Sequence, residues 1–300
     1  MTDLYKKNNH IMNDSNLPWT EDKHKITEAY FEAINKNNLE LFRIIKIHLK
    51  ELDGVLPILE FIIERLETVA TLTVDNRIWD AEIVLRSAIE TFVKYVFITT
   101  ADEDERKIRL DEFWNLLAEV NSLKQSEQAK KNLKHLGGLE THNLAYSPMV
   151  LPEEIEAELR TKWIKAERQK LEQKWSFTEI VNSLSRNYRG KPMEIFITIT
   201  HGYRMSSHVT HGDETGILII RERNSRPFED RELAYFTHYL RLLSDVFTFC
   251  TFIGIETMNL LGLEKDYFFK NQESLKDIQV LTEKYHNDLF QDKDYDKYRK

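Results

Sequence analysis

The sequence predicts a mainly α-helical fold, in the form of a helical bundle with additional peripheral helices. Only 9 of the 300 residues are glycine and 6 are proline, so the residues that form tight turns and interrupt helices are scarce. Apolar residues make up 41% of the chain, which is enough to bury a substantial core. Helical patterns follow one another along most of the length. Together these three observations favour long helices over sheets.

The first half of the chain begins with a polar segment, residues 1–20, which is expected to form a flexible arm. A helical domain is then predicted over residues 21–262, with its core at about 55–260. Its first helices are expected at residues 21–50, 53–74, 77–99, 103–120 and 123–136.

Residues 137–152 interrupt this order, because they contain two glycines and two prolines and show no periodicity. They are therefore predicted to form a long loop or an inserted flap. Further helices are expected at residues 153–173, 176–188 and 191–211.

The short apolar stretch 216–224 is ambiguous by periodicity and is interpreted as a strand or an apolar linker. A long helix at 228–262 is expected to complete the domain. The remainder, 263–300, is charged and is predicted to hold a helix at 272–290 followed by a solvated tail.

Charge and cysteine content restrict the class of function. The formal net charge is −8 and the isoelectric point about 5.8, which argues against a broad basic surface for nucleic acid but leaves room for a local basic pocket. The single cysteine, Cys250, excludes an intramolecular disulfide and is expected in the core. The N-terminus has no apolar core typical of a secretory signal, and the longest apolar run, 246–255, is about half a membrane span. A cytoplasmic protein without a membrane partner is therefore expected.

Polar and titratable residues concentrate in the segment 201-HGYRMSSHVTHGD-213. On a helix, Arg204, His208 and His211 fall on one side, because their spacing follows the three- and four-residue rhythm of a helical face. Ser207 and His201 lie at the edges of that side, opposite the apolar residues of the same helix. The sequence therefore predicts a helix face that is rich in basic and titratable groups.

The chemistry of this face is suited to a phosphate. Gly212 is a natural residue to end the helix, which places His211 in the last turn. There the helix dipole favours the protonated form of His211, whereas the positive charge of Arg204 disfavours it. An arginine can bind an anion and stabilise developing charge, while a histidine moves a proton. The same pattern is also typical of a helix face that contacts only solvent.

A second charged group lies on the helix 78–98, whose apolar face contains Glu82, with Arg86 at its margin and Glu90 further round. Charges in such positions are costly unless they are paired. Arg86 can reach either glutamate at four-residue spacing, so one interpretation is a local ion-pair ladder. The other is that these side chains orient the groups of the 201–211 helix.

The spacing of Arg204 and His211, with six residues between them on a late helix, resembles the R-x4-6-H motif of the HEPN superfamily. Three segments in order, 79-WDAEIVLRSAIE-90, 175-WSFTEIV-181 and 203-YRMSSHVTHGD-213, are also similar to a family of uncharacterised bacterial proteins. In that family an R-x3-E helix precedes a tryptophan-serine element and a Y-R-x2-S-x3-H segment, which begins here at Tyr203. The resemblance covers about residues 55–260.

The resemblance implies a HEPN-like helical bundle that is typically a homodimer, and a metal-independent ribonuclease in toxin–antitoxin or antiphage systems. Arg204 and His211 would be the catalytic pair, cleaving RNA by attack of a 2′-hydroxyl to leave a cyclic phosphate, without a metal or other cofactor. Arg86, Glu90, Glu82 and Tyr203 would support the pair. Ser207, His208 and His201 would be candidates for contact with RNA. An antitoxin or a defence-system protein would be a further partner.

Two alternatives remain open. Active HEPN ribonucleases usually carry a polar residue directly after the arginine, whereas this chain has Met205, which favours a catalytically inactive module for binding or regulation. The other alternative is a metal site in which His208 and His211 bind one ion with Asp213 or Glu82. The chain has no HExxH or CxxC motif to support that metal site, and no Walker A or GxSxG motif for other chemistries.

Overall fold

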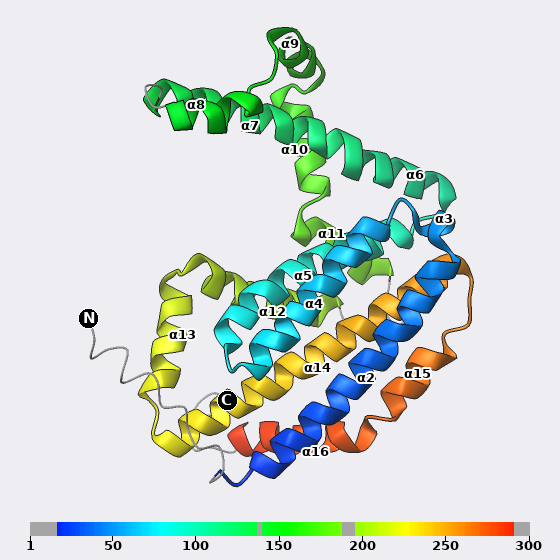
Figure 1. Cartoon of the computed structure of the whole chain (residues 1–300), viewed down its shortest axis with the longest axis vertical. Helices are drawn as coiled ribbons and strands as arrows, with labels where there is room; N and C mark the ends of the chain where they lie inside the picture. Colours follow the sequence, from blue (N-terminus) through cyan, green and yellow to red (C-terminus); the bar gives the residue numbers. More distant parts are fainter. Residues whose placement is uncertain (1–16, 137–139, 188–195, 291–300) are drawn as a thin grey trace. The chain divides into compact units, whose positions relative to one another are not determined.

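The computed structural model describes residues 17–136, 140–187 and 196–290, and Figure 1 shows that the regular structure in these ranges is helical. None of the described residues forms a strand. The prediction of a mainly α fold is therefore confirmed. No helix in these ranges is both long enough and apolar enough to cross a membrane.

The described chain divides into two compact units, each assembled from separate segments. The first unit comprises the described parts of Met1–His48, Leu66–Val84 and His211–Lys300. The second comprises those of Leu49–Arg65 and Leu85–Thr210. The division falls within three helices, α4 (Leu56–Val74), α5 (Ile78–Thr99) and α12 (Phe196–His211).

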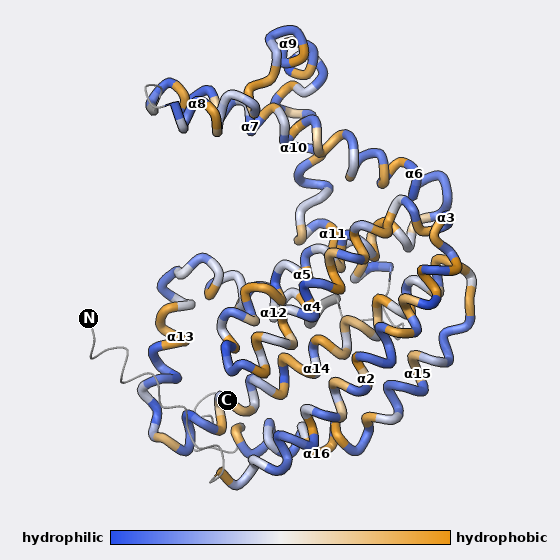
Figure 2. The backbone as a smooth tube through the Cα atoms, in the orientation of Figure 1, coloured by the Kyte–Doolittle hydropathy of each residue, from blue (hydrophilic) through white to orange (hydrophobic). Residues whose placement is uncertain are grey.

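The first unit is organised around its longest helix, α14 (Phe228–Leu261). Apolar residues recur along this helix at three- and four-residue spacing and are buried, including Leu243, Val246 and Ile253, a pattern visible in Figure 2 as alternating colours along the tube. The helix ends at Gly262, which adopts a left-handed conformation (φ 66°) that is open to glycine. The helices that pack against α14 include α2 (Thr20–Ile47), α13 (Glu214–Ser225), α15 (Asp266–Glu273) and α16 (Lys276–Phe290).

The C-terminal helices are integral to this unit. Asn271 on α15 donates hydrogen bonds to the Asn37 side chain (2.7 Å) and to the Ala33 carbonyl (2.8 Å) of α2. Asn37 in turn donates to Thr251 on α14 at 2.9 Å. The side chains of Asn37, Thr251 and Asn271 are all buried, so their polar atoms need hydrogen-bond partners, and they find them in one another. The helix expected at 272–290 is in fact divided between α15 and α16.

The second unit contains one long helical run in which α6 (Glu103–Asp111), a π-helical turn η2 (Glu112–Leu116) and α7 (Leu117–Leu136) follow without a break. The break expected between residues 120 and 123 does not form. Asp102 caps the start of this run by accepting a hydrogen bond from the Glu105 amide at 2.9 Å. The other helices that lie wholly in this unit are α3 (Leu49–Leu52), α8 (Glu140–Tyr146), α9 (Glu153–Lys162), α10 (Lys165–Lys174) and α11 (Phe177–Asn187). All of α12 except its last residue, His211, also belongs to this unit.

The predicted loop at 137–152 is largely helical. Residues 140–149 form α8 and the short 3-10 helix η3 (Ser147–Met149), while residues 137–139 lie outside the described residues. The two prolines thus lie at the starts of short helices, Pro148 in the first turn of η3 and Pro152 at the N-cap of α9. The helix expected at 153–173 is broken at residues 163–164, where the buried side chain of Trp163 donates to Glu119 at 2.7 Å.

The segment 216–224, interpreted as a strand or linker, belongs to the helix α13. Asp213 caps this helix, because its side chain accepts a hydrogen bond from the Gly216 amide at 3.0 Å. The run of isoleucine and leucine has high β-propensity, but the capping residue and the packing of α13 against α14 select the helix.

Candidate functional site

A tyrosine on α12 is held by charged and aromatic groups from two other helices of the second unit. Arg86 on α5 donates a hydrogen bond to the Tyr203 hydroxyl at 2.7 Å, and that hydroxyl donates to Glu90 at 3.3 Å. Lys94, one turn further along α5, donates to the other oxygen of Glu90 at 3.0 Å. The Phe177 ring of α11 stacks on Tyr203 with 3.6 Å between ring centroids and 14° between planes. We call these five residues the Tyr203 cluster.

The electrostatics of the Tyr203 cluster keep Glu90 ionised and Tyr203 protonated at neutral pH. Burial raises the pKa of Glu90, but the charge of Lys94, its hydrogen bond, and the charge of Arg86 outweigh burial and lower the pKa overall. Burial, followed by the charge of Glu90, raises the pKa of Tyr203. Glu90 is therefore an anion that accepts hydrogen bonds, and Tyr203 keeps its proton and donates. The cluster is suited to fixing α12 rather than to moving protons.

The tryptophan-serine element places the aromatic part of this cluster. Trp175 is buried and donates its indole N–H to Glu112 of η2 at 2.9 Å. Ser176 precedes α11, and its hydroxyl accepts from the Glu179 amide at 3.4 Å, which satisfies a free amide at the helix start. Phe177, the first residue of α11, is thereby held where it stacks on Tyr203. The three segments that carry the resemblance thus contribute to one cluster in the second unit.

The predicted catalytic residues follow this anchored tyrosine on α12. Arg204 is exposed, and His211, the last residue of the helix, is also exposed. They are seven residues apart, so they share a face about two turns, or roughly 10 Å, apart along the axis. Gly212 ends the helix as expected, with φ 57°. The imidazole is therefore not packed in the interior.

The other predicted residues on α12 have mixed surroundings. Ser207 and His208 are half-buried. The neighbouring Ser206 is fully buried and donates to the Gly202 carbonyl at 3.0 Å, which shows which side of α12 faces the protein. The side chain of His201 lies outside the described residues.

Glu82 belongs to a different group of residues, in the first unit. Its carboxylate is buried and pairs with Arg241 and with the imidazole Nε2 of His238, which lies at 2.5 Å. Arg223 on α13 approaches the other imidazole nitrogen, Nδ1, at 2.5 Å. The Trp79 ring covers this group edge-on to His238, with 5.1 Å between ring centroids. Glu82 therefore lies in a buried ion-pair network, which we call the His238 network.

The tautomer of His238 follows from its neighbours. A guanidinium can only donate, so Nδ1 of His238 accepts from Arg223. Nε2 lies 2.5 Å from the Glu82 carboxylate and 3.1 Å from the Arg241 guanidinium. Since a carboxylate can only accept, the shorter of these two contacts places the proton on Nε2, which donates to Glu82. Burial, and then the charge of Arg223, lowers the pKa of His238 to about 3. His238 is thus a neutral structural hydrogen-bond partner at physiological pH and does not shuttle protons.

Sequence reasoning missed His238, Arg223 and Arg241. The available signal was a histidine and an arginine inside the apolar pattern of the 228–262 helix, in 233-LAYFTHYLRLL-243. Such residues need buried partners, in the same way as Glu82 on its own helix. Pairing the two observations would have predicted this contact.

The alternative metal site receives no support from geometry. Within residues 17–136, 140–187 and 196–290, no three side chains of His, Cys, Asp or Glu are grouped so that they could hold one metal ion. Cys250 is buried on α14, as expected, and burial raises the pKa of its thiol to about 12, so it is not a reactive nucleophile.

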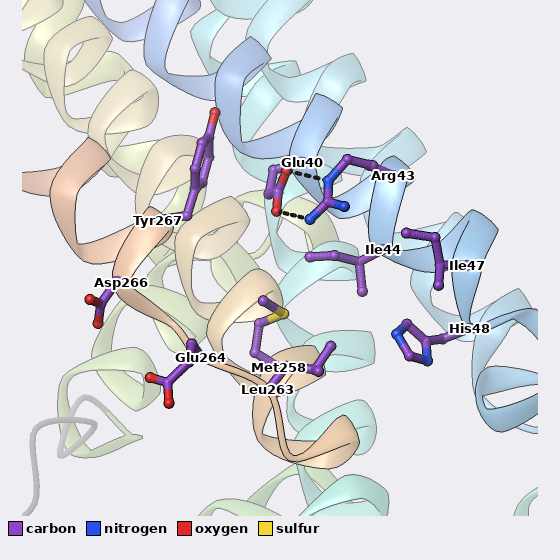
Figure 3. Close-up of a pocket in the computed structure, with 10 residues that line it drawn as sticks. All are labelled: Glu40, Arg43, Ile44, Ile47, His48, Met258, Leu263, Glu264, Asp266 and Tyr267. Atoms are coloured by element: carbon purple, nitrogen blue, oxygen red, sulfur yellow. Dashed lines mark hydrogen bonds and ion pairs between the residues drawn. The ribbon is translucent and has the colours of Figure 1, made fainter.

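A cleft of about 470 Å³ lies in the first unit, between the end of α2, the end of α14 and the start of α15 (Figure 3). Glu40 and Arg43 form a two-pronged ion pair across its upper wall, at 2.8 and 2.7 Å. The arginine is therefore already neutralised. The remaining lining residues are Ile44, Ile47, His48, Met258, Leu263, Glu264, Asp266 and Tyr267. None of the site residues predicted from the sequence lines this cleft.

Fold and cluster together define an all-helical class of protein in which a polar cluster on α5, α11 and α12 anchors a helix with an exposed arginine and histidine. The chain belongs to a family of unknown function, DUF5677, which matches residues 54–225. The matched region contains the whole Tyr203 cluster together with Arg204 and His211, while His238 and Arg241 lie beyond it. No curated protein and no solved structure gives a match to the chain.

Proposed function

We propose that the protein is a metal-independent endoribonuclease of HEPN type that acts in the cytoplasm as a toxin or antiphage-defence effector. The observation that carries the proposal is the exposure of Arg204 and His211 on one face of α12. Both side chains are accessible to a large anionic substrate, and neither is engaged in a buried ion pair of the kind that Glu82 forms. RNA is the proposed substrate, and a homodimer is the proposed state.

The proposed reaction needs only these two side chains. Arg204 binds the scissile phosphate and stabilises the charge that develops on its oxygens. His211 accepts the proton of the RNA 2′-hydroxyl, whose oxygen attacks the adjacent phosphorus. The bond to the 5′-oxygen breaks, leaving a 2′,3′-cyclic phosphate, and the departing 5′-oxygen takes a proton from water to become a 5′-hydroxyl. No metal or organic cofactor enters this scheme.

The Tyr203 cluster has a positioning role in this proposal. Tyr203 precedes Arg204 directly, and its hydroxyl is held between Arg86 and Glu90 of α5. Because the cluster fixes the rotation of α12 about its axis, it keeps the face with Arg204 and His211 turned outward. Such a contact acts through the helix and not on the substrate.

Cleavage of labelled RNA in excess EDTA tests the proposal. General acid–base catalysis contributes about 10²–10⁴-fold, so His211→Ala should lower the cleavage rate by at least about 100-fold. His135→Ala is a matched control, because His135 is also exposed in the last turn of a helix, α7, and should leave the rate unchanged. Equal cleavage by the His211→Ala protein, or cleavage that EDTA abolishes, would reject the proposal.

A second candidate is an inactive module of the same fold that binds RNA or a nucleotide within a toxin–antitoxin or defence complex. The observation that favours it is Met205, which is 36% exposed beside Arg204, where a polar residue would assist catalysis. This candidate predicts binding of RNA without cleavage. In such a module the Arg204 guanidinium would still contact an RNA phosphate, so Arg204→Ala should weaken the binding.

A further inference from the structure

The helix α13 has two faces of opposite character. One face lies against the first unit: Gly216 is buried there, and Arg223 donates to His238. The opposite face holds Glu214, Ile217, Leu218 and Arg221, at the spacing i, i+3, i+4 and i+7 that defines one side of a helix. All four are exposed, Ile217 by 56% and Leu218 by 50%. We call these four residues the α13 stripe.

The order of chemistry along the α13 stripe is its informative property. An acid stands at the N-terminal end, two large apolar side chains in the middle and a base at the C-terminal end. When two such stripes are laid antiparallel, Glu214 of each meets Arg221 of the other, and Ile217 meets Leu218. A parallel arrangement would instead place like charges together. The stripe is therefore complementary to itself under a two-fold axis through its centre.

From this self-complementarity we infer that the α13 stripe is the surface by which a second copy of this chain docks, with the two α13 helices antiparallel. The two charges are available for such a contact, because neither Glu214 nor Arg221 forms an ion pair with any residue that the structure describes. Other charges of the helix are already engaged: Glu222 pairs with Arg226 at 2.8 Å.

The size of the surface sets the expected strength. With 12 residues, α13 is about 18 Å long, so a single pair of stripes buries less area than a permanent dimer requires. We therefore expect a reversible dimer with a dissociation constant on the order of micromolar. This inference does not rest on the proposed ribonuclease activity, since it concerns a surface that contains none of the proposed catalytic residues.

Sedimentation equilibrium of the full chain, from about 1 to 200 μM, tests the inference, since this range brackets the expected dissociation constant. The wild type should pass from monomer to dimer over this range, and Ile217→Glu should remain monomeric. Ile108→Glu is the matched control, because Ile108 is similarly exposed (52%) on α6 and should leave association unchanged. Because these positions are exposed, each variant should keep the unfolding midpoint of the wild type, which confirms that it folds.

A charge-reversal cycle distinguishes the α13 stripe from any other dimer surface. Glu214→Arg or Arg221→Glu alone replaces two attractions with two repulsions and should raise the dissociation constant about tenfold. The double variant restores opposite charges and should return to within about threefold of the wild type.

Several outcomes would overturn the inference. The first is a wild type that stays monomeric over the whole concentration range, and the second is a dimer that still forms in the Ile217→Glu variant. The third is a double charge-reversal variant whose dissociation constant is as high as that of the single variants.

Discussion

The guanidinium of Arg86 on α5 donates a hydrogen bond of 2.7 Å to the hydroxyl of Tyr203 on α12, although 117 residues separate them in the chain. The same guanidinium lies over the tyrosine ring, with its carbon 4.6 Å from the ring centroid. This contact joins the helix with the R-x3-E pattern to the helix with the exposed arginine and histidine. The hydroxyl oxygen of Tyr203 is therefore the atom whose removal tests the positioning role of the Tyr203 cluster.

Replacing Tyr203 with phenylalanine should lower the free energy of unfolding by about 1–2 kcal/mol, measured by chemical denaturation. The ring can still stack on Phe177, but the hydroxyl that links Arg86 to Glu90 is lost. The Nε atom of Arg86 is already buried without a partner among the described residues, so the guanidinium would lose one of its few hydrogen bonds. Tyr235→Phe, which removes a more exposed hydroxyl bond, should cost clearly less, and equal costs would contradict the prediction.

Two acids on α5 should differ sharply when each is replaced by alanine. Glu82→Ala removes the buried carboxylate shared by Arg241 and His238, while Arg241 keeps Asp245 at 2.6 Å, so the substitution should cost about 2–3 kcal/mol. Asp80→Ala removes an exposed pair with Arg77 and should cost less than about 1 kcal/mol. Denaturant unfolding of both variants checks this, and similar costs would mean that the His238 network contributes little to stability.

His238 should make the protein less stable as the pH falls. Burial and Arg223 lower its pKa to about 3 in the folded state, against about 6.5 in an unfolded chain, so below pH 6.5 the unfolded chain binds a proton that the folded chain does not. The stabilising contribution is therefore present above about pH 6.5 and is lost progressively toward pH 3. The loss should approach about 1.4 kcal/mol per pH unit within this window.

The variant His238→Gln isolates this effect, because glutamine cannot be protonated in this range. Its unfolding free energy should change less between pH 7 and pH 4 than that of the wild type. If the two proteins lose stability in parallel over that interval, the imidazole is not the group that causes the pH dependence.

Glycine-to-alanine substitutions at two helical positions should change the stability of the protein in opposite directions. A methyl group at Gly254 on α14 would overlap the buried ring of Phe268, so Gly254→Ala should destabilise the protein by about 1–3 kcal/mol. Gly202 on α12 has open space around it, and Gly202→Ala should stabilise by about 0.5–1 kcal/mol. Thermal unfolding of the two variants, with Phe268→Leu added to the first to restore room, tests the assignment. A stabilising Gly254→Ala would show that α14 and α15 are not packed as described.

The errors in the predicted helices have local and identifiable causes. The stretch 216–224 reads as a strand or an apolar linker because isoleucine and leucine run together, yet Asp213 caps a helix there and that helix packs against α14. The segment 137–152 reads as a loop because it contains glycine and proline, yet its two prolines stand at the starts of the short helices η3 and α9. In both cases the pattern was too short for periodicity to decide.

The sequence by itself determined the helical class and most of the long helices, such as those near 53–74, 77–99 and 228–262, because a helix repeats a local pattern that can be read from neighbouring residues. It also identified Arg86, Glu90 and Tyr203 as residues of interest. Only the tertiary structure decided which partners the charged side chains take. Glu82 meets His238 and Arg241 instead of completing a ladder beside Arg86, because a buried charge pairs with whatever opposite charge the packing of distant helices brings within reach.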